Sequence, residues 1–162
     1  MATSFTVSGP TMVQVATAEG TYVDLGMADN DNLPQVTITD HIHEIKTSAS
    51  GAVPEEMVLQ GISATITVTL VKWDPAIWTN LQTHQRGAQF TATIGRMIVA
   101  EEKFFGLRLA PVTTDRPGYE FPVCYLMNDT TDSQFGNVER RLAITFKAIP
   151  GTDGALCQYT EF

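Results

Sequence analysis

Alternation of apolar and polar residues is the feature that most constrains how this chain folds. In residues 62–70 every second side chain is apolar, and the positions between them include Thr65, Thr67 and Thr69. A period of two places one set of side chains on each face of a β-strand. Threonine suits a strand because its β-branched side chain is stiff and packs well on a pleated surface. The segment therefore predicts a strand with one buried face and one threonine-rich face.

The same alternation recurs along most of the chain and predicts a protein built mainly of β-strands. Residues 36–45 and 141–149 form the next clearest runs, although the phase of the first blurs between Asp40 and Glu44. Such a loss of phase indicates a β-bulge or the end of a strand. Shorter strands are predicted at residues 4–8, 12–17, 21–26, 89–94, 106–110 and 121–127.

One segment carries helical signals instead. Asp74 followed by Pro75 is typical of a helix N-cap with proline in the first turn, and Ile77, Trp78 and Leu81 follow at helical spacing. We expect one helix at residues 75–85 that packs its apolar side on the sheet. The fold class predicted is therefore mainly β, an antiparallel β-sandwich or small barrel with one flanking α-helix, in a single domain of residues 1–162.

Four polar or turn-rich segments separate the predicted elements, namely residues 27–34, 47–54, 112–118 and 128–137. The second of them joins two strong strands, is rich in small residues and is too long for a tight hairpin. Loops of this length in compact domains are commonly functional or disordered.

The charge of the chain limits its partners. Formal net charge is -8, so the chain is repelled by a phosphate backbone and ordinary duplex binding is not expected. Solubility alone accounts for such a charge, and so does a surface over which DNA slides. Only 17% of residues are charged, against about 25% in typical domains, which is typical of a surface largely covered by other molecules and also of enzymes with deep pockets. No run of about 18 apolar residues and no leader-like segment occurs, so we expect no membrane anchor.

No motif for catalysis or a cofactor stands out, and we predict a protein that is not an enzyme. His41 and His43 would share one face of a strand and could supply two metal ligands with His84 as a third, but a polar strand end explains them more simply. Glu55 and Glu56 are adjacent, so on a strand they would point to opposite faces. The chain contains no G-x-S-x-G, P-loop or G-x-G-x-x-G sequence.

The C-terminal tail, at about residues 150–162, ends in apolar side chains that include Tyr159 and Phe162. Two interpretations stay open: the tail docks on a neighbouring subunit, or it closes its own sheet.

The order of features from Thr37 to Asp74 resembles the tail tube proteins of tailed phages and related contractile injection systems. A strand ends near TITDHIHEIK and the small-residue loop SASGAVP follows. Then EEMVLQGISATITVTLVKWD supplies an acidic loop end, a glycine before a long alternating strand, and an aromatic residue and aspartate before the helix. The segment GTYVDLGMADN is similar to the early hairpin of such subunits. The resemblance covers about half of the chain.

This resemblance implies a structural protein of the virion. Six subunits would join their sheets into a ring, and rings would stack into a hollow tube that conducts DNA without binding it specifically. Tail sheath, baseplate and terminator proteins would be further partners, in a tail assembled in the host cytoplasm. Thr65, Thr67 and Thr69 are candidates for the lumen face. A loop at about residues 40–57 would reach the adjacent ring, with Asp40, His41, His43, Glu44, Lys46, Glu55 and Glu56.

The chain contains two cysteines, and their redox state has two interpretations. Cys124 and Cys157 are either reduced and packed, or Cys157 meets Cys124 of a neighbour in a disulfide that staples the tube after release. The alternatives to a tube protomer are a tail terminator or baseplate ring protein, and a β-sandwich module for receptor binding or capsid decoration. A hydrolase on a β scaffold would need a pocket with a perturbed acid–base pair.

Overall fold

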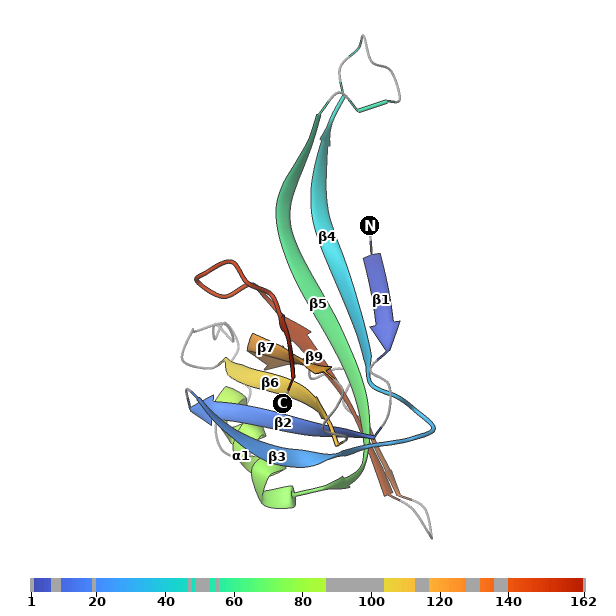
Figure 1. Ribbon diagram of the computed structural model, residues 1–162, viewed down its shortest axis with the longest axis vertical. Coiled ribbons are helices and arrows are strands. Elements are labelled where there is room, and N and C mark those ends of the chain that lie inside the picture. The colour runs from blue at the N-terminus through green and yellow to red at the C-terminus, as the bar shows by residue number, and fades with distance from the viewer. Residues whose placement is uncertain are drawn as a thin grey trace.

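The fold is a closed β-barrel from which a long two-stranded ribbon projects (Figure 1). The computed structural model describes residues 2–6, 10–18, 20–46, 48, 53–54, 56–86, 104–112, 117–127, 132–135 and 140–161. Its elements in chain order are β1 (Ala2–Thr6), β2 (Thr11–Ala18), β3 (Thr21–Ala28), β4 (Gln35–Ile45), β5 (Glu56–Trp73), α1 (Pro75–Arg86), β6 (Phe105–Pro111), β7 (Pro117–Leu126), β8 (Asp132–Phe135), β9 (Arg140–Ala148) and β10 (Gln158–Glu161). The predicted mainly β fold with one helix is confirmed.

A ring of hydrogen-bonded strands forms the barrel. β5 pairs with β3, and the ring continues through β2, β6, β7 and β9, which returns to β5. Every one of these pairings is antiparallel. Closure of the sheet pairs the edges that an open sheet would leave exposed, so the barrel form of the prediction is the one observed.

The alternation along β5 places its apolar side chains in the core. Ala64, Ile66, Val68 and Leu70 are each at most 1% exposed, and Thr67 between them is exposed. The inward residues of the other strands meet them, among them Val13, Val15, Leu25, Leu107, Leu109, Phe121, Leu142, Ile144 and Phe146. Burial of these aliphatic and aromatic side chains is the main stabilisation of the barrel.

The helix begins where the sequence predicts and ends one residue later. The Asp74 carboxylate accepts hydrogen bonds from the backbone N–H groups of Ala76 and Ile77, at 2.8 and 3.4 Å, and so satisfies donors that a helix start leaves free. Leu81 is fully buried, and Trp78 packs against the core. The expectation that the helix packs its apolar side inward is therefore confirmed.

Four strands extend the sheet beyond the barrel. β4 pairs with β5, β1 pairs with β4, β8 pairs with β9, and β10 pairs with β7. β8 lies in a segment that was expected to be a polar connection. Its sequence DSQF has no apolar alternation, and only its pairing with β9 makes it a strand. The strand predicted at residues 89–94 lies outside the described residues.

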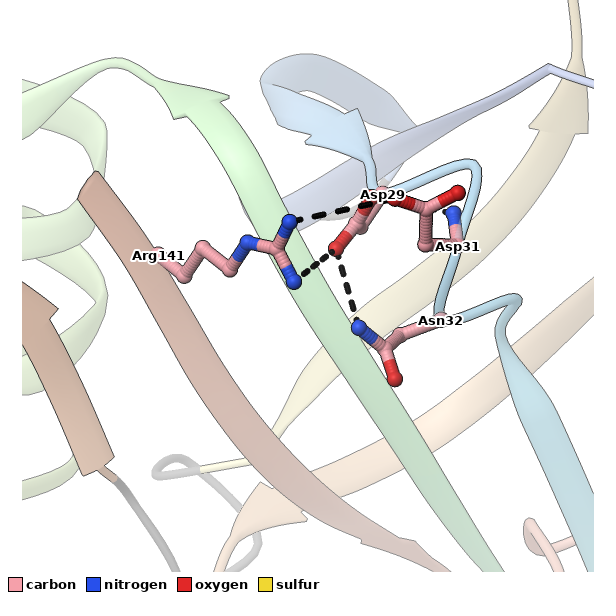
Figure 2. A network of polar contacts seen from close by, with 4 residues as sticks. All are labelled: Asp29, Asp31, Asn32 and Arg141. Atoms are coloured by element: carbon pink, nitrogen blue, oxygen red, sulfur yellow. Dashed lines mark hydrogen bonds and ion pairs between the residues drawn. The ribbon is translucent and has the colours of Figure 1, made fainter. Parts of the chain in front are cut away.

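A network of polar contacts ties the connection between β3 and β4 to β9 (Figure 2). The Asp29 side chain is only 6% exposed and its Oδ2 lies 3.1 Å from Nη1 of Arg141. Asn32 donates to the same oxygen at 3.0 Å, and the Asp31 backbone N–H donates to Oδ1 at 3.0 Å. A buried carboxylate with this many donors holds the turn in one geometry.

Candidate assembly surface

Beyond the barrel, β4 and β5 continue together as a ribbon that projects from the body (Figure 1). We define residues 40–45 and 56–62 as the arm. Its two strands pair from Asp40 opposite Ile62 to Ile45 opposite Glu56. Of the loop expected at about residues 40–57, residues 40–45 and 56–57 belong to the paired strands β4 and β5, so the connection between the strands is shorter than expected. Its location between the two long strands is as expected.

A β-bulge at the base of the arm keeps apolar side chains on one face. His41 is opposite Gly61, but the next residue, Ile42, is opposite Leu59, so Gln60 is the extra residue. A one-residue shift reverses the facing of every later side chain. Leu59 and Met57 therefore continue the face that Ala64 and Ile66 present to the core. The register shift lies where the phase of residues 40–44 blurs, but the extra residue is in β5 and not in β4.

The arm exposes large apolar side chains on both faces. On the face that continues the core, Ile42, Met57 and Leu59 are 44%, 66% and 61% exposed. On the opposite face, Ile45 and Val58 are 38% and 48% exposed. Antiparallel sheets that face water on one side have a polar outer face, and a contiguous exposed apolar patch usually marks an interaction site.

The arm also has two strand edges with no pairing partner in the described part of the chain. The pairing of β1 with β4 ends at Ala2 opposite Thr39, and the pairing of β9 with β5 begins at Ala64. The unpaired N–H and C=O groups of residues 40–45 and 56–63 can accept a further strand. Apolar faces and open edges together make the arm the candidate functional site.

The polar residues predicted for this region lie on or beside the arm. His43, Glu44, Lys46 and Glu56 are exposed and Asp40 is half-buried. Lys46 Nζ lies 3.0 Å from Glu44 Oε2. Glu55 lies outside the described residues.

The two histidines of the arm do not build a metal site in the residues that the structure describes. His41 Nε2 lies 3.1 Å from Ser63 Oγ. His84 is on α1, where its Nε2 lies 3.1 Å from the carbonyl oxygen of Phe104. Among the described residues, no group of three or more potential ligands gathers.

Thr65, Thr67 and Thr69 share the face of β5 that points away from the core. Thr37 of β4 is opposite Thr65, and Thr145 of β9 is opposite Thr67. The outer face of β4, β5 and β9 is thus rich in hydroxyl groups and poor in carboxylates, and Lys147 opposite Thr65 adds a positive charge to it. Its assignment to a lumen stays a prediction.

The C-terminal tail closes its own sheet. β10 pairs with Pro117–Glu120 of β7, and the Tyr159 ring lies 5.0 Å from the Tyr119 ring, centroid to centroid. Tyr159 is nevertheless 65% exposed, so its outer side stays available to a neighbour. Phe162 lies outside the described residues.

The two cysteines are reduced and sit in apolar surroundings. Cys124 has no exposed surface and Cys157 packs against the core. Burial raises the pKa of both thiols, which lowers their reactivity. A disulfide from Cys124 to a neighbour's Cys157 would require β7 to leave the core, so this geometry favours the reduced alternative.

A groove of about 920 Å³ opens beside the turn between β2 and β3. The Tyr22 hydroxyl donates to Glu120 Oε1 at 2.8 Å, and Arg108 Nη2 donates to Glu120 Oε2 at 3.0 Å. The guanidinium carbon of Arg108 lies 3.9 Å from the centre of the Tyr22 ring. Burial, and then the hydrogen bond to Glu120, raise the pKa of Tyr22 well above its usual value.

Sequence reasoning did not single out Tyr22 or Glu120, because 98 residues separate them and neither belongs to a local motif. Arg108 pairs with Glu120 within the chain.

Comparison with protein-family models finds no match to this chain, and neither does comparison with curated proteins. No helix in the described residues has the length and apolar character needed to cross a membrane.

Proposed function

We propose that this chain is a structural protomer of a hollow tube of the phage-tail type and not an enzyme. In this proposal six copies form a ring, rings stack, and DNA passes through the channel during ejection. The arm is the observation behind the proposal, because it exposes large apolar side chains and, among the residues that the structure describes, strand edges that can pair with a further strand.

The body and the arm have separate roles in this proposal. The closed barrel keeps each copy folded before assembly, since its own strands pair in a ring. The arm is the part that reaches a neighbouring copy. A contact between two different surfaces of the same chain repeats from copy to copy, and it generates rings or filaments.

The charge pattern supports a channel that DNA crosses without adhering. The chain has a net charge of -8, and this charge on the molecule as a whole opposes non-specific binding of phosphates. The threonines of β5 supply uncharged polar side chains for the channel wall, beside the Lys147 ammonium on the same face. Sheath, baseplate and terminator proteins are the further partners we propose, in a virion tail.

Sedimentation velocity over a range of protein concentrations tests this proposal. We expect a species of one chain at low concentration and very large species at high concentration, because a repeating contact has no natural end. A mass that settles at one chain or three chains at every concentration would contradict the proposal and favour a binding module. A single closed ring with no larger species would favour a terminator or baseplate ring protein.

A further inference from the structure

The outer face of β4, β5, β9 and β7 combines hydroxyl groups with one positive charge. Residues opposite each other in antiparallel strands project to the same side of a sheet. Thr37, Thr65 and Lys147 therefore form one row across β4, β5 and β9, and Tyr125 of β7 extends the row because it is opposite Lys147. We define the hydroxyl face as these four residues together with Thr39, Ser63, Thr67 and Thr145 of the adjoining rows.

Lys147 differs from three other cations of the chain, because its ammonium has no carboxylate partner in the part of the chain that the structure describes. Lys46, Arg108 and Arg141 lie 3.0, 3.0 and 3.1 Å from carboxylate oxygens. The Lys147 side chain is half-buried, and the adjacent Thr67 is exposed. An ammonium beside hydroxyl groups can accept an anion without first breaking an ion pair.

Among the described strands, the carboxylates on this side of the sheet lie at its ends. Glu56 is at the end of the arm, and Asp132 of β8 is opposite Ala143 of β9. Ala143 and Lys147 are on one strand, roughly 13 Å apart at about 3.3 Å per residue. This separation exceeds the Debye length of about 10 Å at 0.1 M salt. At that salt an anion in contact with Lys147 is therefore attracted more by the lysine than it is repelled by Asp132.

The side chains of the hydroxyl face are of the types that contact DNA without reading its sequence. Lysine, serine, threonine and tyrosine are frequent donors to phosphate oxygens. One lysine on a surface gives a weak contact, because a solvent-exposed ion pair contributes at most about 1 kcal/mol. A weak contact suits a wall along which DNA moves.

We propose that the hydroxyl face contacts the phosphate backbone of duplex DNA through Lys147, with the Thr65 hydroxyl as a donor beside it. This inference rests on the proposed function, because the channel of the tube brings DNA to this face. Each copy supplies one weak contact, and successive copies repeat it along the path of the DNA. The net charge of -8 keeps every contact weak.

Amide chemical shifts of the isotope-labelled full chain test the inference, at a concentration where the chain is single and with a short DNA duplex at about 0.1 M salt. We expect the duplex to shift the amides of Thr65, Thr145 and Lys147 most. Lys147→Gln should lose these shifts, and Lys147→Arg should keep them because it keeps the charge.

Lys72→Gln is the matched control, since Lys72 is an exposed lysine of β5 opposite Met27, away from the hydroxyl face. It should leave the shifts unchanged. Shifts that persist in Lys147→Gln, shifts lost equally in Lys72→Gln, or no shifts on this face would each overturn the inference.

The salt dependence of the wild-type titration gives a second readout. One lysine that neutralises one phosphate gives a slope of roughly −0.9 for log affinity against log salt. The affinity should therefore fall about twofold when salt rises from about 0.1 M to about 0.2 M. A slope of about −3 or steeper would overturn the inference, because several cations elsewhere would then be binding the DNA.

Sedimentation of wild-type protein separates failure of the inference from failure of the proposed function. If the protein assembles but the duplex does not shift the hydroxyl face, the inference fails and the proposed function stands. If the protein stays as single chains while the duplex shifts this face through Lys147, the proposed function fails and the phosphate contact stands.

Discussion

At the scale of single residues, Asp29 holds the turn after β3 through contacts that reach across the sheet. Its carboxylate accepts from Asn32, from the backbone of Asp31 and from Arg141 of β9. The hydrogen bond from Asn32 is the largest cause that lowers the pKa of Asp29, followed by that from the Asp31 backbone. Burial acts in the opposite direction. The charged form of Asp29 is thus the form that the fold requires.

We expect Asp29→Asn to destabilise the protein by roughly 2 kcal/mol at neutral pH, because an amide N–H₂ would face the donors of Asn32 and Arg141. Asp31→Asn is the matched control, since the Asp31 side chain is 84% exposed and 3.9 Å from Arg141. It should change stability by less than about 0.5 kcal/mol. Urea unfolding measures both, and equal effects of the two variants would contradict the role given to Asp29.

The pH dependence of the same variant follows from the direction of the pKa shift. The pKa of Asp29 in the folded state is below its ordinary value of 3.8, so the unfolded chain binds the proton first as pH falls. The stabilisation is present above about pH 4 and is lost as pH falls through the folded-state pKa. The stability difference between wild type and Asp29→Asn should therefore shrink from pH 6 toward about pH 3. A difference that stays constant would show that the carboxylate charge is not involved.

Gly26 is required by the close approach of β3 to β5. A Cβ at this position would overlap the carbonyl oxygen of Lys72 and lie 2.8 Å from the Cα of Trp73, both backbone atoms of β5. Gly61, also in a strand, has nothing within 4 Å of such a Cβ. We expect Gly26→Ala to lower the free energy of unfolding by about 3 kcal/mol and Gly61→Ala to change it little. Thermal unfolding of the two variants checks this, and a neutral Gly26→Ala would mean that the strands can separate at no cost.

At the scale of elements, Gln85 joins the end of α1 to the end of β7. Its amide donates to the carbonyl oxygen of Leu126 at 3.0 Å and accepts from the N–H of the same residue at 2.6 Å. The Gln85 amide thus pairs with both backbone groups of Leu126, as the backbone of an adjacent strand would. Gln85 is 2% exposed, so water cannot replace it when it is removed.

We expect Gln85→Met to destabilise the protein by about 2–4 kcal/mol, because the buried N–H and C=O of Leu126 would lose their partner. Gln82→Met, at a half-buried position of the same helix, is the control with the same change of side chain. Amide hydrogen exchange of Leu126 is the direct readout. Unchanged protection of this amide in Gln85→Met would contradict the assignment.

The elements with a strong period were predictable, and those defined only by pairing were not. The alternation of residues 62–70 and the capped start of α1 depend on local sequence, so both appear where expected, although β5 extends beyond the predicted run from Glu56 to Trp73. β8 has no apolar period, and only its neighbour β9 makes it a strand. The closure of the barrel depends on pairing between distant segments, which left sandwich and barrel equally open.

The candidate site was predicted in place but not in form. The segment 47–54 was expected to be a connection and lies between the end of β4 and the start of β5, but the strand at residues 56–61 was not expected, because Met57, Val58 and Leu59 are apolar in a row and show no alternation. The bulge at Gln60 decides which side chains of the arm continue the core face, and it follows from strand register, which the sequence does not state. The exposed residues Ile42 and Leu59 were therefore not singled out.

At the scale of the whole molecule, the barrel covers its own apolar side chains, whereas the arm leaves apolar side chains exposed. The barrel pairs its own strands in a ring and buries a continuous core. The arm has two apolar faces and two open edges, which a single copy does not cover in the part of the chain described. Other copies of the same chain are the partners that complete it in our account.

Negative-stain electron microscopy of the purified protein at high concentration tests the central claim most directly. The account predicts stacked rings with a central channel, and it predicts that Leu59→Ser shifts the sample toward single particles at the same concentration. A uniform field of small discrete particles in the wild-type sample would contradict it.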